Sequence, residues 1–185
     1  MRVVIGLAAV VLAFVVGFWG SSALPEDARG FELTRVDGQV INSAEDLAGE
    51  PYLITFGYTY CPDVCPTTMA HLAAVLQAHE QQTGKAIQAI FVSVDPDRDT
   101  PEQLGQYAAY FDERIWALSG TAAQLEALKA EYSVYFAKVP GTSADDYLMD
   151  HSAGVLVLDE RHRLRGVIRE GESVAQSLAT LAEVL

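Results

Sequence analysis

The hydrophobic and polar positions along the chain predict a succession of strands and helices from residue 31 onward. Apolar and polar residues alternate over residues 31–41 on both sides of Asp37-Gly38, which predicts a β-hairpin with a type I′-like turn. Residues 52–58 and 86–94 are apolar runs without polar alternation. Such runs are typical of central strands that are covered on both faces.

Between and after these runs, apolar residues recur at helical spacing. Met69, Leu72, Ala73 and Leu76 predict an amphipathic helix over residues 66–83, which Gly84 ends. Capping-box sequences predict where three further helices begin, at Thr100, Thr121 and Ser173. Their expected inward faces are Leu104, Tyr107, Ala108 and Phe111, then Leu125, Leu128 and Tyr132, and finally Val174, Leu178, Leu181 and Leu185.

The remaining apolar runs are short and predict strands at residues 115–118, 133–139, 153–158 and 164–168. A polar, acidic loop is expected over residues 140–146. Alternation of strands and helices around one core predicts an α/β fold. A strand followed by a cysteine pair at a helix start, together with a C-terminal β-β-α unit, indicates a thioredoxin-like fold with an N-terminal β-hairpin.

The N-terminus has a different character from the rest of the chain. An uncharged run over residues 3–19 would span roughly 26 Å as a helix, close to the thickness of a bilayer core. Arg2 precedes this run, and Glu26 and Asp27 come after it, so the positive-inside rule predicts export of the remaining chain. We expect residues 1–23 to form a transmembrane anchor or a signal sequence, and residues 24–185 to form one exported domain.

Composition narrows the possible partners. The net charge of −13 argues against nucleic-acid binding, which requires a basic surface. Half of the residues are apolar, so a domain of this size can bury a full core without needing a disulfide.

Cys61 and Cys65 are the only cysteines in the sequence, and they lie between an apolar strand and a helix start. A structural disulfide, a thiol-exchange pair and a soft-metal site are the three interpretations that this placement allows. A helix N-terminus favours thiolate, although the common exchange motif has two intervening residues rather than three.

A metal site would need a third ligand. His71 and His79 fall opposite the apolar stripe of their helix, and His162 lies in a charged turn, so all three are expected at the surface. His151 instead comes after the acidic loop and directly precedes an apolar strand. Loops at one edge of a parallel sheet converge, which makes His151 the candidate. Asp95 ends a strand at the same edge and is a candidate second partner that orients a ligand, although a turn-forming role is favoured.

Three stretches resemble the Sco/SenC family of copper proteins of cytochrome c oxidase assembly. They are the runs FGYTYCPDVCP around Cys61 and Cys65, VSVDPDRDTP around Asp95, and YLMDHS around His151. The resemblance covers about residues 30–185 and implies a membrane-anchored, thioredoxin-like domain. It also implies that Cys61, Cys65 and His151 bind one copper ion, as Cu(I), Cu(II) or both in turn.

The function that the resemblance implies is that of a copper metallochaperone rather than an enzyme. It would receive copper from an upstream donor and deliver it to the Cu(A) centre in subunit II of cytochrome c oxidase, on the periplasmic side of a bacterial inner membrane. Two alternatives use the same cysteines: a thiol–disulfide oxidoreductase that keeps the Cu(A) cysteines reduced, and a redox sensor.

Overall fold

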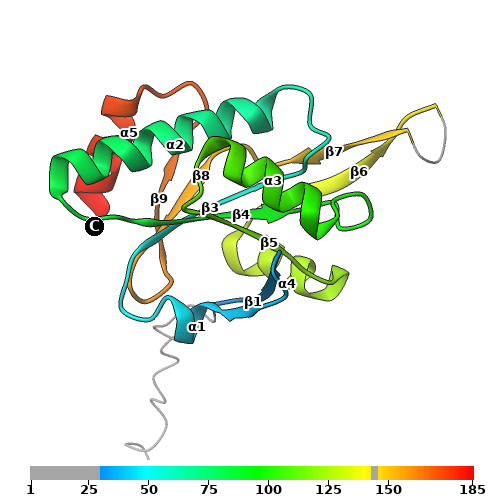
Figure 1. Ribbon diagram of the computed structural model, residues 1–185, viewed down its shortest axis with the longest axis horizontal. Coiled ribbons are helices and arrows are strands. Elements are labelled where there is room, and N and C mark those ends of the chain that lie inside the picture. The colour runs from blue at the N-terminus through cyan, green and yellow to red at the C-terminus, as the bar shows by residue number, and fades with distance from the viewer. Residues whose placement is uncertain (1–29, 143–145) are drawn as a thin grey trace, which may run out of the picture.

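The computed structural model describes residues 30–142 and 146–185. They form a seven-stranded sheet in the order β2-β1-β5-β4-β3-β8-β9, and a separate two-stranded sheet of β6 and β7 (Figure 1). In chain order, the elements are β1 (Glu32–Arg35), β2 (Val40–Asn42), α1 (Ser43–Asp46), β3 (Tyr52–Gly57), α2 (Val64–Thr83), β4 (Gln88–Ser93), α3 (Pro101–Phe111), β5 (Ile115–Ser119), α4 (Ala122–Tyr132), β6 (Phe136–Pro140), β7 (Tyr147–His151), β8 (Val155–Leu158), β9 (Leu164–Ile168) and α5 (Val174–Val184).

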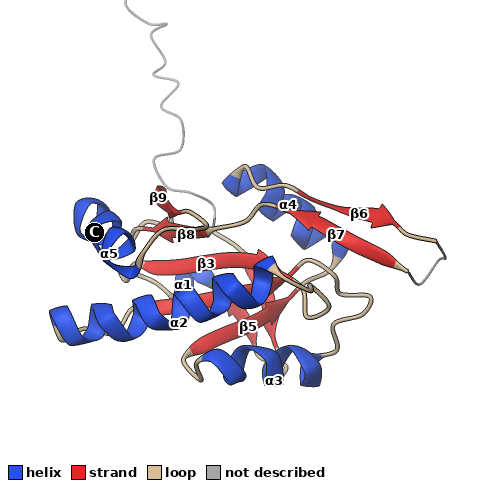
Figure 2. Ribbon diagram, turned by 90° about the horizontal axis from the view of Figure 1, so that it is seen from above, coloured by secondary structure: helices blue, strands red, loops and turns tan. Residues whose placement is uncertain are grey.

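The centre of the large sheet is parallel and buried on both faces. β3 pairs in parallel with β4, and β4 with β5, while β8 runs antiparallel along the other side of β3. All six residues of β3 are buried, as its continuous apolar sequence predicts. One apolar cluster joins the sheet to α2, α3 and α5, and a second joins its other face to α4, so helices cover both faces (Figure 2).

The predicted helix ends are confirmed. Thr100, Thr121 and Ser173 each accept a hydrogen bond from the backbone N–H three residues on, and the reciprocal glutamine bond is present in each case. Gly84 ends α2 in the left-handed conformation, with φ +73°. The expected inward position of Leu185 is wrong, because this last residue is 49% exposed.

Three local features differ from the expectations. The hairpin between β1 and β2 forms, but only Gly38 of the Asp37-Gly38 pair has a positive φ, so the turn is not type I′. α1 is a short helix that was not predicted; the side chain of Asn42 caps it. Residues 147–151, between the expected loop and the next predicted strand, form strand β7, which was not predicted; it pairs with β6 in a hairpin that projects from the body (Figure 1).

The predicted membrane anchor, residues 1–23, lies outside the described residues. Within residues 30–142 and 146–185, none of the helices combines the length and the apolar character that crossing a membrane requires.

Candidate metal centre

The cysteine pair lies where the central strand β3 passes into helix α2. Cys65 is the second residue of α2 and is 3% exposed, whereas Cys61 lies in the preceding loop and is half-buried. Both are free thiols. The two cysteines therefore do not form a disulfide in this structure, and both sulfurs are available as ligands or nucleophiles.

Cys61 takes part in the start of the helix. The N-cap residue Asp63 makes no side-chain capping bond, and the backbone N–H of Cys65 donates instead to the Cys61 sulfur at 3.5 Å. Backbone N–H groups at a helix start have no partner within the helix and favour an anionic acceptor. The Cys61 sulfur thus takes the capping role that the Asp63 side chain leaves unfilled.

Gly57, the last residue of β3, leaves room for the buried sulfur. A Cβ atom at this position would lie 2.8 Å from the Cys65 sulfur and 2.8 Å from a ring carbon of Phe91. The absent side chain thus lets the strand end pass directly beneath Cys65.

His151 is the last residue of β7, and its ring is oriented by the backbone of the next residue. Its Nδ1 lies 3.1 Å from the carbonyl oxygen of Ser152. A carbonyl oxygen only accepts, so Nδ1 is the donor, and Nε2 is the ring nitrogen left to bind a metal ion. That Nε2 lies 3.2 Å from the Cys65 sulfur, and the Tyr58 ring meets the imidazole edge-on at 6.0 Å.

The structure therefore brings together the three residues that were singled out from the sequence. One ligand atom from each of Cys61, Cys65 and His151 lies within 4.8 Å of the other two. Across residues 30–142 and 146–185, no second group of three or more histidine, cysteine or acidic side chains meets the same distances. Two sulfurs and one imidazole nitrogen are a soft donor set, which suits Cu(I) or zinc among common metals.

Burial determines the protonation state of Cys65 when no metal is bound. It raises the pKa of the Cys65 thiol well above its ordinary value, so this group is a neutral thiol at neutral pH. The S–H then donates to Nε2 of His151, whose lone pair faces it. A soft cation would displace this proton and bind the two groups that now share it.

The site is accessible from one side. A hollow of about 400 Å³ opens beside it, between the cysteine loop and the β6–β7 hairpin. Its lining residues are Tyr58, Cys61, Pro62, Asp63, Val64, Val139, Leu148, Met149, Asp150 and His151.

The acidic residues after β4 supply no ligand atom to this group. The Asp99 carboxylate accepts bonds from the hydroxyls of Thr59 and Ser93, both at 2.6 Å. Asp95 is 2% exposed and accepts from the hydroxyl of Tyr147 at 2.7 Å. Asp99 therefore holds the segment before Cys61, and Asp95 holds the first residue of β7. Asp97 lies at the surface, where it forms an ion pair with Lys138.

The other histidines lie away from this centre, and all three are less exposed than expected; His79 is half-buried, with its Nδ1 3.1 Å from the carbonyl oxygen of Lys85. His71 is half-buried, because its Nε2 meets the Ser177 hydroxyl of α5 at 2.9 Å. His162 is 7% exposed and packs against the ring of Tyr52 at 5.8 Å, so the expectation of a surface position is wrong.

Sequence reasoning gave no role to four residues that shape the site: Gly57, Tyr58, Arg98 and Tyr147. A glycine that ends a buried strand just before a cysteine loop is a local sign of close packing. An arginine between Asp95 and Asp99, at the end of another buried strand, also indicates a charged network. The two tyrosines carry no comparable signal.

Fold and site together define a thioredoxin-like domain in which a Cys-x-x-x-Cys pair at a helix start meets a distant histidine. The SCO1/SenC family model matches residues 22–185, and the chain belongs to that family.

Individual relatives agree with this assignment. The chain is 32% identical over 148 residues to the mitochondrial SCO2 homolog of Bos taurus, and 35% identical over 133 residues to an SCO2-like protein of Rickettsia felis. These alignments take in 76% and 70% of this chain but only 56% and 62% of the relatives.

Solved structures show the same fold. Copper-bound ScoI of Bradyrhizobium japonicum superposes with a TM-score of 0.73 at 37% identity, over 84% of this chain and 97% of that one. Copper-bound ScoI of Arabidopsis thaliana gives a TM-score of 0.76 at 28% identity, over 83% and 94% of the two chains.

Proposed function

We propose that this protein is a copper metallochaperone that binds one copper ion through Cys61, Cys65 and His151. The observation that carries the proposal is the convergence of their three donor atoms within 4.8 Å, from a loop, a helix and a hairpin strand. Copper, rather than another soft ion, is favoured by the copper-bound ScoI structures of the same family.

The charge of the donor set suits a carrier that meets copper in two oxidation states. Two thiolates and a neutral imidazole bring a charge of −2, which leaves −1 with Cu(I) and 0 with Cu(II). Neither state leaves a large uncompensated charge in a partly buried site. Three protein ligands also leave room for a group from a receiving protein, whereas a closed four-ligand site is typical of a structural metal.

The recipient that we propose is the Cu(A) centre in subunit II of cytochrome c oxidase, with an upstream protein as the copper donor. The hollow beside Cys61 and His151 gives such a partner access to the site. A membrane anchor at residues 1–23 and a periplasmic location for residues 24–185 are part of the same proposal. They rest on the N-terminal sequence alone.

Metal titration of the purified full-length chain tests the ligand set. We expect one Cu(I) per chain in competition with a chromophoric chelator, and binding weakened in His151→Ala by more than the roughly 10-fold to 100-fold that loss of a residue orienting a ligand costs. Cys61→Ser and Cys65→Ser should each weaken binding further, because a hydroxyl is a poor ligand for soft copper. His79→Ala is the matched control, since His79 lies on α2 away from the site. Equal affinities of the wild type and His151→Ala would sink the three-ligand proposal.

A second function, thiol–disulfide exchange, is favoured by one observation: Cys61 is half-buried and reachable, whereas Cys65 is buried behind it. Cys61 thiolate would attack a disulfide of the target, and Cys65 would then displace the target thiol. This sequence of steps leaves a Cys61–Cys65 disulfide here and passes two electrons to the target cysteines. A redox sensor would use the same pair with a different partner.

Substitution of His151 distinguishes copper transfer from thiol reduction. If copper transfer is the role, His151→Ala should lose oxidase assembly together with copper affinity. If thiol reduction is the role, His151→Ala should retain assembly while either cysteine substitution abolishes it.

A further inference from the structure

The strand that carries His151 needs an external anchor. Among the residues that the structure describes, β7 pairs with β6 alone, and neither strand is hydrogen-bonded into the seven-stranded sheet from which the cysteine loop emerges. The hairpin projects from the body of the domain (Figure 1). Its position relative to Cys61 and Cys65 therefore depends on side-chain contacts at its base rather than on a continuous sheet.

One such contact holds the first residue of β7. Arg98 donates from Nη1 to the carbonyl oxygen of Tyr147 at 2.9 Å, and its guanidinium lies 3.6 Å from the centre of the Tyr147 ring. The Tyr147 hydroxyl donates to Asp95 at 2.7 Å, and Asp95 also forms an ion pair with Arg98 at 2.5 Å. Tyr147 is thus fixed through its backbone, its ring and its hydroxyl.

The same guanidinium reaches the cysteine side of the site. It lies 5.0 Å from the ring centre of Tyr60 and 5.6 Å from that of Tyr58, within the range of cation–π attraction. Tyr58 in turn contacts the imidazole of His151. Arg98 therefore touches residues on both sides of the metal site.

The ion pair between Arg98 and Asp95 is largely shielded from solvent. The side chain of Asp95 is 1% exposed and that of Arg98 is 20% exposed. Within the described residues, Nη2 of Arg98 is buried without a hydrogen-bond partner, and the rings of Tyr147, Tyr60 and Tyr58 lie within 5.6 Å of the guanidinium carbon. Lysine would keep the charge but lose the planar fork that reaches Asp95 and the Tyr147 carbonyl at once.

We propose that Arg98 is a positioning residue for the metal site, one that holds the His151 strand in register with the cysteine loop. The proposal rests on the proposed ligand set and adds a residue that touches none of the three ligands by hydrogen bond. Arg98 acts through Tyr147 at one end of β7 and through Tyr58 beside the imidazole.

A double-mutant cycle on Cu(I) affinity tests this role. In the full-length chain, Arg98→Lys should weaken Cu(I) binding by about 10-fold, as the loss of an orienting partner commonly does. In the His151→Ala background the same substitution should change affinity by less than about 2-fold, because the residue that it positions is gone. Equal effects of Arg98→Lys in both backgrounds, or no effect in either, would overturn the proposal.

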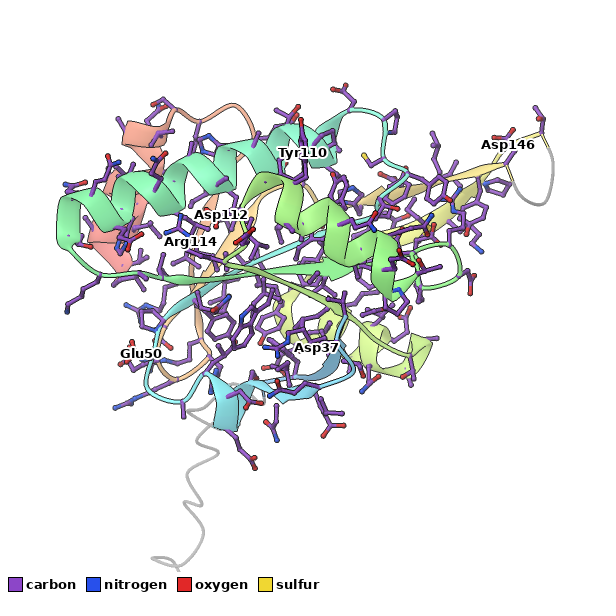
Figure 3. All side chains as sticks on the ribbon, viewed as in Figure 1. Asp37, Glu50, Tyr110, Asp112, Arg114 and Asp146 are labelled. Atoms are coloured by element: carbon purple, nitrogen blue, oxygen red, sulfur yellow. The ribbon has the colours of Figure 1, made fainter. Side chains whose placement is uncertain are left out.

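A milder variant and a control keep the cycle interpretable. Tyr147→Phe removes only the hydroxyl that binds Asp95, so it should fold and should show a smaller effect that also disappears in His151→Ala. Arg114→Lys is the matched control: Arg114 pairs with Asp112 and Glu80 on another part of the surface (Figure 3) and should leave Cu(I) affinity unchanged.

A metal-free readout separates positioning from simple loss of stability. In the NMR spectrum of the apo protein, Arg98→Lys should shift the His151 ring resonances and speed hydrogen exchange of the Ser152 amide, which bonds to Tyr135. Amides in the buried strand β3 should keep their protection. A uniform loss of protection across β3 and β7 would contradict the positioning role.

Equal Cu(I) affinities of the wild type and His151→Ala would overturn the ligand set itself, and a His151 effect without an Arg98 effect would overturn only this inference.

Discussion

The two ends of strand β3 carry the same pair of side chains in different surroundings. Just after its last residue, Tyr58 meets His151 edge-on with ring centres 6.0 Å apart. At its beginning, Tyr52 meets His162 with ring centres 5.8 Å apart and planes tilted by 49°. A buried tyrosine beside a histidine is therefore not by itself a sign of function in this molecule.

What distinguishes the two ends is the direction of the free ring nitrogen and what faces it. Nε2 of His151 faces the Cys65 sulfur at 3.2 Å, with Cys61 close by. At the other end, Nδ1 of His162 is buried without a hydrogen-bond partner among the described residues. The nearby Tyr52 hydroxyl instead shares a 3.4 Å bond with Tyr132.

The comparison assigns different roles to the two histidines. His151 has an oriented lone pair in a group of soft donors, next to a hollow that a partner can enter. His162 fills space in the core at the turn between β8 and β9, with a left-handed φ of +62°. One end of β3 is therefore built for binding, and the other for packing.

The largest effect on stability should come from His162→Ala. Loss of the ring removes its contact with Tyr52 and leaves a cavity in a site that is 7% exposed, which should lower the free energy of unfolding by about 2 to 3 kcal/mol. Cu(I) affinity of the folded protein should stay within about 2-fold of the wild type. Urea unfolding and chelator competition measure the two quantities.

For His151→Ala we expect the opposite pattern: Cu(I) binding is weakened, and the free energy of unfolding changes little. His79→Ala removes the bond between Nδ1 and the Lys85 carbonyl oxygen at the end of α2, so it should lower the free energy of unfolding by about 1 kcal/mol and leave copper affinity unchanged. A His162→Ala protein that loses copper as His151→Ala does would break the comparison between the two ends.

A smaller loss of stability, joined to a loss of binding, is expected for Gly57→Ala. The added Cβ would lie 2.8 Å from both the Cys65 sulfur and the Phe91 ring, and overpacking of this kind costs about 1 to 2 kcal/mol. Displacement of the sulfur should weaken Cu(I) binding by about 10-fold. Gly166→Ala on β9 is the matched control, because its nearest side-chain atom would lie 3.3 Å away. Equal Cu(I) affinities of the two variants would show that the strand end does not shape the site.

Much of the fold was predictable because its signals are local. The apolar run of β3, the capping boxes at Thr100, Thr121 and Ser173, and the terminating Gly84 each depend on residues within one element. The hairpin of β6 and β7 has no such signal in its second strand. Leu148 is 54% exposed and pairs with Val139, which is 46% exposed, and Tyr147 alone among the five residues of β7 is fully buried, so the apolar residues do not mark one buried face there.

The site was predictable in part for a similar reason. The spacing of Cys61 and Cys65 and the position of His151 before an apolar strand can be read from the chain, and the structure places the three together. The buried position of His162 cannot be read in this way, because it depends on a left-handed backbone and on Tyr52, which is far away in sequence. The link from Arg98 to Tyr147 likewise joins residues that only the folded hairpin brings together.

The smallest effect concerns Asp159, in the turn beside His162. Burial alone would raise the pKa of this carboxyl, but hydrogen bonds from the side chain and backbone of Arg163 and from the backbone of Arg161 outweigh it and lower the pKa below its ordinary value. The unfolded chain therefore takes up the proton at a higher pH than the folded protein does. The resulting stabilisation is fully present above the unfolded pKa of about 3.9, and it is lost as the pH falls through the folded value.

Asp159→Asn removes this pH-dependent contribution, so the stability difference between wild type and variant should be larger at pH 6 than at pH 3. The difference should change by no more than about 1 kcal/mol, because Arg163 is partly exposed. Urea midpoints at both pH values measure it, and Cu(I) affinity at pH 7 should be the same in both proteins. A stability difference that does not change with pH would show that the arginine contacts do not hold this carboxylate in its charged form. Altered copper affinity would instead show that the packing end of β3 communicates with the binding end.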